Sequence, residues 1–254
     1  MIDPILLKVG IFEIRWYGLL YALAFLVGYF ILLKLAPRFN IKKEHIEDYI
    51  PWIIIADIVG ARLFEVIFYD PVYYFSNPLK ILAVWEGGLA SHGAIIAIIL
   101  ATIYFCRKRK LSFYNFTDAV AIPVALGAAF IRLGNFINSE LIGKISGVPW
   151  AVQFAGYEGL RHPVQLYQAL GHIIIFIVLL SMLKISHRKE GTIFWSLLFL
   201  DSLFRFFTEF FKDLPYDYGF FIFNLNLAQW ASIIIILISI KPIWKIIKHL
   251  HKPS

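Results

Sequence analysis

The stretch Ala119-Val-Ala-Ile-Pro-Val-Ala-Leu-Gly-Ala-Ala-Phe-Ile131 runs directly into Arg132-Leu-Gly-Asn-Phe-Ile-Asn-Ser-Glu140. Together with its continuation to Ile137, the apolar part is long enough to cross a bilayer as a helix, which takes about 20 such residues. The second part places an arginine, two asparagines and a glutamate at the end of that helix. A charged side chain at bilayer depth costs at least about 2.5 kcal/mol. We therefore expect this cluster to act on something polar within the membrane.

The composition of the whole chain is that of a protein that crosses the membrane several times. Of its 254 residues, 60% are hydrophobic and 16% are charged, and the mean hydropathy is +0.73. Soluble domains usually carry about 25% charged residues. We expect an all-α integral membrane protein that forms a single domain over residues 1–254. The seven predicted transmembrane helices are Trp16–Ala36, Tyr49–Phe68, Leu89–Phe105, Ala119–Ile137, Val164–Leu183, Thr192–Phe211 and Leu227–Ile240.

The lysines and arginines predict the orientation of these helices. Fifteen lie at one set of helix ends and six at the opposite set. Because cytoplasmic loops carry the excess of positive charge, the N-terminus is expected outside and the C-terminus in the cytoplasm. This arrangement explains the net charge of +7 without a nucleic-acid partner. The remaining three arginines, Arg62, Arg132 and Arg205, fall inside predicted spans.

Two connections on the predicted outer face are long. The segments Tyr69–Gly88 and Gly143–Pro163 each run over about 20 residues and contain Gly, Pro, Trp and Tyr. Connections of this length are uncommon and are often functional. We expect two arm-like or head-like pieces at the interface, where a lipid head group or a translocated peptide meets the protein. The chain shows no internal repeat, which weakens an inverted-repeat transporter interpretation.

The sequence offers no support for a metal, a cofactor or a disulfide. Cys106 is the only cysteine, and it lies beside the basic run Arg107–Lys110, which is expected in the cytoplasm. No Cys-x-x-Cys or His-Glu-x-x-His spacing occurs, so a zinc site has no basis. The first apolar run also lacks the features of a cleavable signal peptide.

The polar cluster after the fourth predicted span is the main candidate site. Arg132, Asn135 and Asn138 are spaced i, i+3, i+6 and would share one face of a helix, with Glu140 just beyond. A guanidinium suits a phosphate, and amides suit hydroxyls or ester carbonyls. Hydrogen bonding between helices could explain a single asparagine. It does not readily explain four polar groups around one helix end.

Four further residues are candidates, namely Arg205, Glu209, His92 and Tyr17. Arg205 and Glu209, spaced i, i+4, either neutralise each other or hold the arginine ready for an anion, and Asp201 adds an ionisable group one turn earlier. His92, among glycines, is either a hydrogen-bonded core residue or a base suited to neutral pH. Tyr17 could simply be an interfacial aromatic.

Other interpretations of the polar groups stay open. Arg62, Glu65 and Asp57 are expected to form a buried structural network in the second span. A lipid or anion transporter could use the same arginines as a binding site. Asp57-x-x-Gly-Ala-Arg62 faintly echoes phosphatidyl-type alcohol transferases, but the further aspartates that a metal pair would need are absent.

The sequence closely resembles the bacterial prolipoprotein diacylglyceryl transferases, and the resemblance covers nearly the whole chain. Arg132–Glu140 matches the family's signature. Other matches follow in the family's order: Trp16-Tyr-Gly18, Ser91-His-Gly93, His162-Pro-x-Gln-Leu-Tyr167 and Arg205-x-x-x-Glu209-Phe-Phe. The resemblance implies a multi-pass enzyme of the bacterial inner membrane with its active site toward the outer leaflet.

The resemblance also implies the reaction and the residues that carry it. The diacylglyceryl group of phosphatidylglycerol would pass to the thiol of a lipobox cysteine in a prolipoprotein, which gives a thioether and glycerol phosphate. This is the first step of bacterial lipoprotein maturation. The implied catalytic residues are Arg132, Arg205, His92 and Glu140. The implied substrate-binding residues are Arg132, Asn135, Asn138, Tyr17, Glu209 and Arg205.

Two positions depart from the family pattern. The fifth-span motif often ends in Tyr-Glu, whereas this chain has Tyr167-Gln168. Asp201 stands where an aromatic residue is expected. These differences concern the handling of substrate and not the type of reaction.

Overall fold

The computed structural model describes residues 2–10, 12–185, 188–214 and 223–250. The chain divides into two compact units, one made of residues 1–32 and 117–254 and the other of residues 33–116. The boundaries fall within the helices α1 (Trp16–Leu35) and α5 (Phe113–Ile137).

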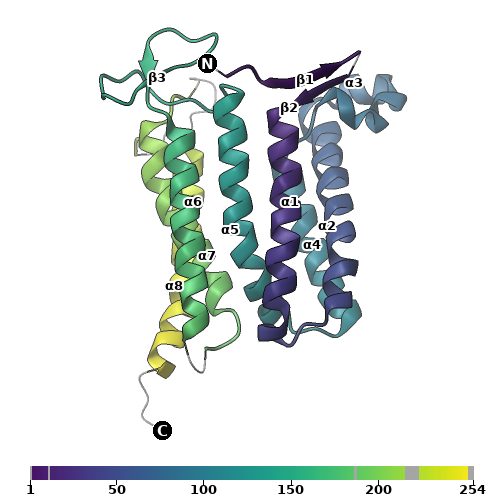
Figure 1. The fold of residues 1–254 in the computed structure, drawn as a ribbon, viewed down its shortest axis with the longest axis vertical. Coiled ribbons are helices and arrows are strands. Elements are labelled where there is room, and N and C mark those ends of the chain that lie inside the picture. Colours follow the sequence, from purple (N-terminus) through teal and green to yellow (C-terminus); the bar gives the residue numbers. More distant parts are fainter. Residues whose placement is uncertain (1, 11, 186–187, 215–222, 251–254) are drawn as a thin grey trace. The chain divides into compact units, whose positions relative to one another are not determined.

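The first unit is built from most of α1 and α5 together with α6 (Val164–Ser181), α7 (Thr192–Thr208) and α8 (Leu227–Leu250). Helix α7 packs against both α6 and α8 (Figure 1). Gly171 of α6 lets α7 approach closely, because a Cβ atom there would lie 2.1 Å from the Phe204 ring. Small residues at such crossings allow membrane helices to pack tightly.

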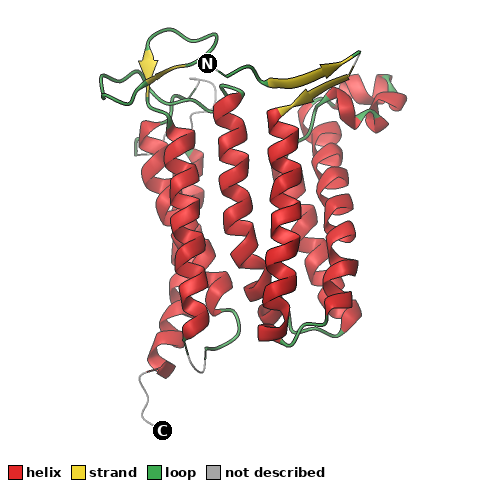
Figure 2. Ribbon diagram, in the orientation of Figure 1, coloured by secondary structure: helices red, strands yellow, loops and turns green. Residues whose placement is uncertain are grey.

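Two small antiparallel sheets also belong to the first unit (Figure 2). The strands β1 (Ile5–Val9) and β2 (Phe12–Arg15) form a hairpin that leads into α1, and β3 (Val152–Gln153) pairs with β4 (Leu160–Arg161) in the loop between α5 and α6. The prediction of a mainly helical membrane protein is confirmed, whereas these sheets were not expected. Strands of two to five residues are too short to give a clear alternation of polar and apolar residues.

Five helices of the described chain are long and apolar enough to cross a membrane. They are Trp16–Phe39, Ser91–Arg109, Phe113–Ile137, Val164–Met182 and Leu227–Trp244. The remaining two predicted spans coincide with α2 (Lys43–Phe64) and α7, which are helical but richer in ionisable residues or shorter. The count of seven spans and the orientation of the termini therefore stay predictions.

The second unit consists mainly of α2 and α4 (Ser91–Arg109), which pack together along their lengths (Figure 1). Gly60 and Gly93 allow the two helices to approach closely, since a Cβ atom on Gly93 would lie 2.2 Å from the Gly60 carbonyl oxygen. The predicted outer segment Tyr69–Gly88 contains the short helix α3 (Pro71–Ser76) and two 3-10 turns.

Arg62 ties this outer segment to α2. Its side chain is buried and donates hydrogen bonds to the hydroxyl of Tyr74 and to five carbonyl oxygens, those of Lys80, Ile81, Ala83, Gly87 and Gly88. The guanidinium is thus satisfied by main-chain oxygens that come from several turns. Arg62 therefore has the structural role expected of it, but its partners lie in the outer segment, and the membership of Glu65 and Asp57 in the same network stays a prediction.

Candidate functional site

The signature segment forms the end of α5 and the turn that follows it. The helix ends at Ile137, so Arg132 and Asn135 lie on it, and Asn138 is the first residue beyond it, with its amide still donating to the Gly134 carbonyl at 3.0 Å. Ser139 and Leu141 have φ angles of 57° and 53°, and the Glu140 amide donates to the Asn135 carbonyl at 2.9 Å. The left-handed residues stop the helix and turn the chain back over its own end.

Glu140 joins the two asparagines of the signature. The Arg132 guanidinium donates to Asn135 Oδ1 at 3.4 Å, and Asn135 Nδ2 donates to the Glu140 carboxylate at 3.0 Å. Asn138 Nδ2 donates to the other carboxylate oxygen at 3.1 Å. Within the described residues, Asn138 Oδ1 is buried without a hydrogen-bond partner. Leaving a buried acceptor unpaired costs about 1–3 kcal/mol, which makes it a candidate to accept from a bound hydroxyl.

Tyr17 from α1 packs on this end of α5. A Cβ atom on Gly134 would lie 2.8 Å from Cδ2 of the Tyr17 ring, so only glycine leaves room for this contact. Tyr17 also interacts electrostatically with Arg132. Tyr17 therefore lies against the signature helix, and the glycine of the signature is needed for this contact, while a role of Tyr17 in substrate binding stays a prediction.

The second arginine, Arg205, begins a network around Glu209. Glu209 Oε1 lies 3.7 Å from Arg205 Nε and 2.9 Å from Lys212 Nζ, while Asn226 Nδ2 donates to Oε2 at 3.3 Å. The Glu209 side chain is only 1% exposed, whereas that of Arg205 is 48% exposed. Burial lowers the pKa of Lys212, with Arg132 and Arg205 acting in the same direction and Glu209 opposing them. Glu209 thus contacts two cations, Arg205 and Lys212. Of these, Arg205 is the one whose side chain stays accessible.

Main-chain pairing connects the signature segment to the Glu209 network. Gly143 and Lys212 form an antiparallel bridge, with the Lys144 amide donating to the Phe211 carbonyl at 2.8 Å. A Cβ atom on Gly143 would lie 2.2 Å from the His162 carbonyl oxygen. Arg161 reinforces the join, since its guanidinium donates to the Gly143 carbonyl and to the Asp213 carboxylate.

The two arginines come from different helices and lie within electrostatic range of each other. Arg132 on α5 interacts with Arg205, Asp201 and Glu209 of the segment that includes α7. Like charges repel, and this pair is kept together because carboxylates flank it. A site that holds two guanidinium groups near each other, one of them accessible, suits an anion with more than one oxygen, such as a phosphate ester.

The first unit holds all the predicted site residues except His92. These residues are Tyr17, Arg132, Asn135, Asn138, Glu140, Arg205 and Glu209. His92 lies in the first turn of α4 in the second unit, with its ring centroid 6.1 Å from that of Phe64. A role for His92 beside the arginines stays a prediction.

Several polar residues of this region were not singled out from the sequence. Lys212 looks like an outer loop cation, yet it is buried against Glu209. Gln165, by contrast, belongs to the motif quoted for the fifth predicted span; it is fully buried and donates to the Glu140 carbonyl at 2.6 Å. Asn226 and Gln229 form a capping box at the start of α8. Their spacing of three residues before an apolar run is the sequence signal for this motif.

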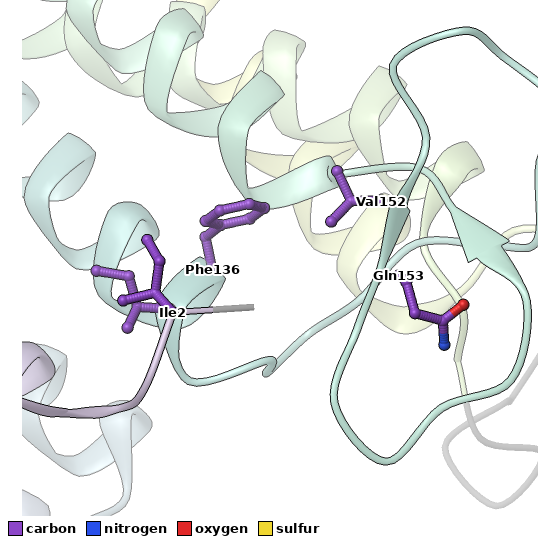
Figure 3. A pocket seen from close by; sticks show the side chains of 5 residues that line it. Ile2, Phe136, Val152 and Gln153 are labelled. Carbon is purple, nitrogen blue, oxygen red and sulfur yellow. The ribbon is translucent and has the colours of Figure 1, made fainter.

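The described residues contain no group of His, Cys, Asp and Glu that could hold a metal ion. A pocket of about 410 Å³ lies beside the signature segment (Figure 3). It is lined by Phe136 and Ile137 from the end of α5, by Val152 and Gln153 from the following loop and by Ile2. Its lining is largely apolar, so it suits hydrocarbon better than a charged group.

These features define a helical, multi-pass membrane protein with a polar site of paired arginines, amides and carboxylates on α5 and α7. The family model for prolipoprotein diacylglyceryl transferase matches residues 4–245, and the chain belongs to that family.

Curated relatives from bacteria match over most of both chains. Phosphatidylglycerol–prolipoprotein diacylglyceryl transferases from Geobacter sulfurreducens and Tolumonas auensis are each 40% identical, over 91% and 94% of this chain and 90% and 93% of their own length. The protein of that name from Janthinobacterium sp. (strain Marseille) is 38% identical over 100% of this chain and 98% of its own.

Proposed function

We propose that this protein transfers the sn-1,2-diacylglyceryl group of phosphatidylglycerol to the thiol of a prolipoprotein's lipobox cysteine. A carbon–sulfur bond forms at the glycerol carbon, the carbon–oxygen bond to the phosphate breaks, and glycerol phosphate leaves with the electron pair of that bond. The thiol proton is removed on the way to the thioether. The family membership supports this proposal, as do the electrostatic interaction between Arg132 and Arg205 and the contact of 3.7 Å that Arg205 makes with the buried Glu209.

The leaving group explains the need for paired guanidinium groups. Negative charge grows on the phosphate oxygen as the carbon–oxygen bond breaks, so preorganised positive charge lowers the barrier. In this proposal Arg132 and Arg205 bind the phosphate, and Glu209 holds Arg205 in place at 3.7 Å. No oxyanion hole is required, because the reaction is alkyl transfer rather than acyl transfer.

The amides and the remaining residues would bind the rest of the lipid head group. Asn138 has a buried acceptor without a partner, and phosphatidylglycerol brings glycerol hydroxyls that can donate to it. Glu140 keeps Asn135 and Asn138 in position through both carboxylate oxygens. Tyr17 would close the site on the α1 side, and His92 is a candidate base for the thiol.

The proposed setting is the bacterial inner membrane. The chain would cross it seven times as one transferase domain over residues 1–254, with its N-terminus outside and its C-terminus in the cytoplasm. The ends of α1, α5 and α6 next to the two small sheets would then meet the outer leaflet, where the secreted precursor arrives. The five apolar helices and the distribution of lysines and arginines support this arrangement.

The decisive experiment mixes purified protein, phosphatidylglycerol labelled in its acyl chains, and a lipobox peptide. Label is expected on the peptide, and a peptide with serine in place of cysteine should stay unlabelled. Arg132→Ala should lower the rate by about 10²–10³, the usual cost of removing one preorganised donor to a developing charge. Arg109→Ala serves as the matched control, because Arg109 is an exposed arginine that pairs with Asp48 in the second unit.

A lipid transporter that uses the same arginines is the competing function. It would move labelled phosphatidylglycerol between the leaflets of a proteoliposome and leave the peptide unlabelled. Lipid movement that is lost in Arg132→Ala, with no labelled peptide under any condition, would overturn the transferase proposal.

A further inference from the structure

A histidine and an aspartate of the first unit lie in contact with each other and interact electrostatically with its two arginines. His172 on α6 is 8% exposed, and its Nδ1 lies 3.4 Å from Oδ1 of Asp201 on α7. The imidazole also interacts electrostatically with Arg132 and Arg205. Asp201 interacts with Arg132 in turn. Helices α5, α6 and α7 therefore each contribute ionisable groups to one cluster.

These groups lie at similar distances from the helix ends on one side of the unit. At 1.5 Å per residue, His172 is about 12 Å from the start of α6 and Asp201 about 10 Å from the end of α7. Arg132 is about 8 Å from the end of α5 by the same measure. An ionisable pair at this depth, where apolar side chains would cost less, points to a function.

Resting on the function proposed above, we propose that His172, oriented by Asp201, is the base that accepts the proton of the lipobox thiol. The thiolate forms the carbon–sulfur bond as the glycerol carbon releases glycerol phosphate, and the thiol proton resides on the imidazole. The protonated ring then returns that proton to the released phosphate or to water. Atoms and charges balance without any further reactant.

The arrangement follows the general pattern of an activated nucleophile. A base lies between the nucleophile and a carboxylate that fixes its ring, and here the substrate supplies the nucleophile. A carboxylate at Nδ1 favours a proton on that nitrogen and leaves Nε2 as the acceptor. The 3.4 Å separation is an ion-pair distance and not a hydrogen bond, since His172 Nδ1 is buried without a hydrogen-bond partner within the described residues, and catalytic contacts often align only when substrate binds.

The two other carboxylates that the structure describes at this site are already engaged. Glu140 accepts from two asparagines, and Glu209 is held by Lys212, Arg205 and Asn226. The groups facing His172 are Asp201 and Arg205 from α7 and Arg132 from α5. The same arginines that hold the phosphate would therefore also stabilise the nearby thiolate.

The test compares two acceptor peptides, one with the lipobox cysteine and one with selenocysteine in its place. A selenol is far more acidic than a thiol and is ionised at neutral pH, so it needs no base. His172→Gln should lower kcat on the cysteine peptide by at least about a hundredfold, and the loss on the selenocysteine peptide should be at least about tenfold smaller. The pH profile of the variant on the cysteine peptide should rise with pH as the free thiol ionises.

Three further variants make the comparison specific. Asp201→Asn keeps the side-chain volume and should lower kcat on the cysteine peptide less than His172→Gln does. The loss of kcat in Asp201→Asn should again be smaller on the selenocysteine peptide. His45→Gln, a partly buried histidine at the start of α2 in the second unit, is the matched control and should leave both rates unchanged. His92→Gln tests the rival base. Thermal unfolding and phosphatidylglycerol binding show that each variant is folded.

Each outcome decides the matter. A selective recovery with selenocysteine in His172→Gln supports the proposal. Equal losses on both peptides would mean a structural role, and no loss on either would remove the histidine from the reaction. A selective recovery in His92→Gln alone would assign the base to His92. If the unaltered protein labels neither peptide, the proposed transferase function fails and this inference falls with it.

Discussion

At the scale of single residues, Gly143 shows how closely the site depends on the main chain around it. Gly143→Ala would place a Cβ atom 2.2 Å from the His162 carbonyl oxygen, so the bridge to Lys212 has to shift. We expect a loss of about 1–3 kcal/mol in stability, as for other overpacked positions, and a large loss of transferase activity. Thermal unfolding and the peptide-labelling assay measure the two effects.

Gly147→Ala in the same loop is the matched control for this substitution. A Cβ atom at Gly147 would meet no other atom within 4 Å, so its stability and activity should stay close to those of the unaltered protein. If both variants behave alike, the close approach of Gly143 to His162 is not what the site requires.

Lys212 makes a second prediction, because it is one of two cations around a buried carboxylate. Lys212→Met would leave Glu209 with Arg205 as its charged partner. Breaking a buried ion pair costs about 3–5 kcal/mol, and the remaining arginine should keep the loss toward the lower end of that range. Chemical denaturation measures it, and activity should fall because Glu209 can then draw Arg205 inward.

Lys144→Met is the control for Lys212→Met, since Lys144 lies in the same bridged segment with an exposed side chain. It should lose less than about 0.5 kcal/mol, the usual range for surface substitutions. A loss equal to that of Lys212→Met would show that the ion pair with Glu209 is not the cause.

At the scale of elements, Arg62 is the link between α2 and the segment Tyr69–Gly88. Arg62→Lys keeps the charge but replaces a fork of five donors by a single ammonium group, which cannot satisfy six oxygen atoms spread over several turns. We expect faster amide hydrogen exchange throughout Pro71–Glu86, with little change in α4. Unchanged exchange there would mean that the segment is held by its other contacts.

The helices of this chain could be predicted from the sequence more fully than the contacts between them. Apolar runs start at the observed first residues of α1, α6, α7 and α8, because a bilayer-spanning helix leaves a long and uniform signal. The two sheets left no such signal, since their strands are short. The turn that follows α5 left no signal either, because the spacing of the polar residues does not reveal that Ser139 and Leu141 adopt left-handed conformations.

The site could be predicted in part, because some of its residues contrast with the apolar sequence around them and others do not. Ionisable residues inside apolar runs stand out, which identified Arg132, Arg205 and Glu209. Lys212 and His172 did not stand out, because burial and a partner on another helix are properties of the packed molecule. Asp201 was noted from the sequence as an ionisable group one turn before Arg205 and as a departure from the family pattern, but its proximity to His172 required coordinates.

At the scale of the whole molecule, the remaining prediction is the orientation of the chain in the membrane. Cys106 is the single cysteine and is buried, so Cys106→Ala gives a background without accessible thiols. We would then introduce Gly147→Cys in the loop between α5 and α6, Arg107→Cys at the end of α4, and Lys189→Cys before α7. Each position is exposed or open to solvent.

If the chain crosses the membrane seven times with its N-terminus outside, the thiol at position 147 lies outside and those at positions 107 and 189 lie in the cytoplasm. A maleimide that cannot cross the membrane should label Gly147→Cys in intact spheroplasts, whereas Arg107→Cys and Lys189→Cys should react only after permeabilisation. The expectation follows from the fifteen basic residues on one set of helix ends, because positive charge is retained in the cytoplasm during insertion. Labelling of Lys189→Cys from outside would place the start of α7 on the outer side. The end of α7 with Arg205 and Glu209 would then not face the leaflet where the lipobox thiol arrives.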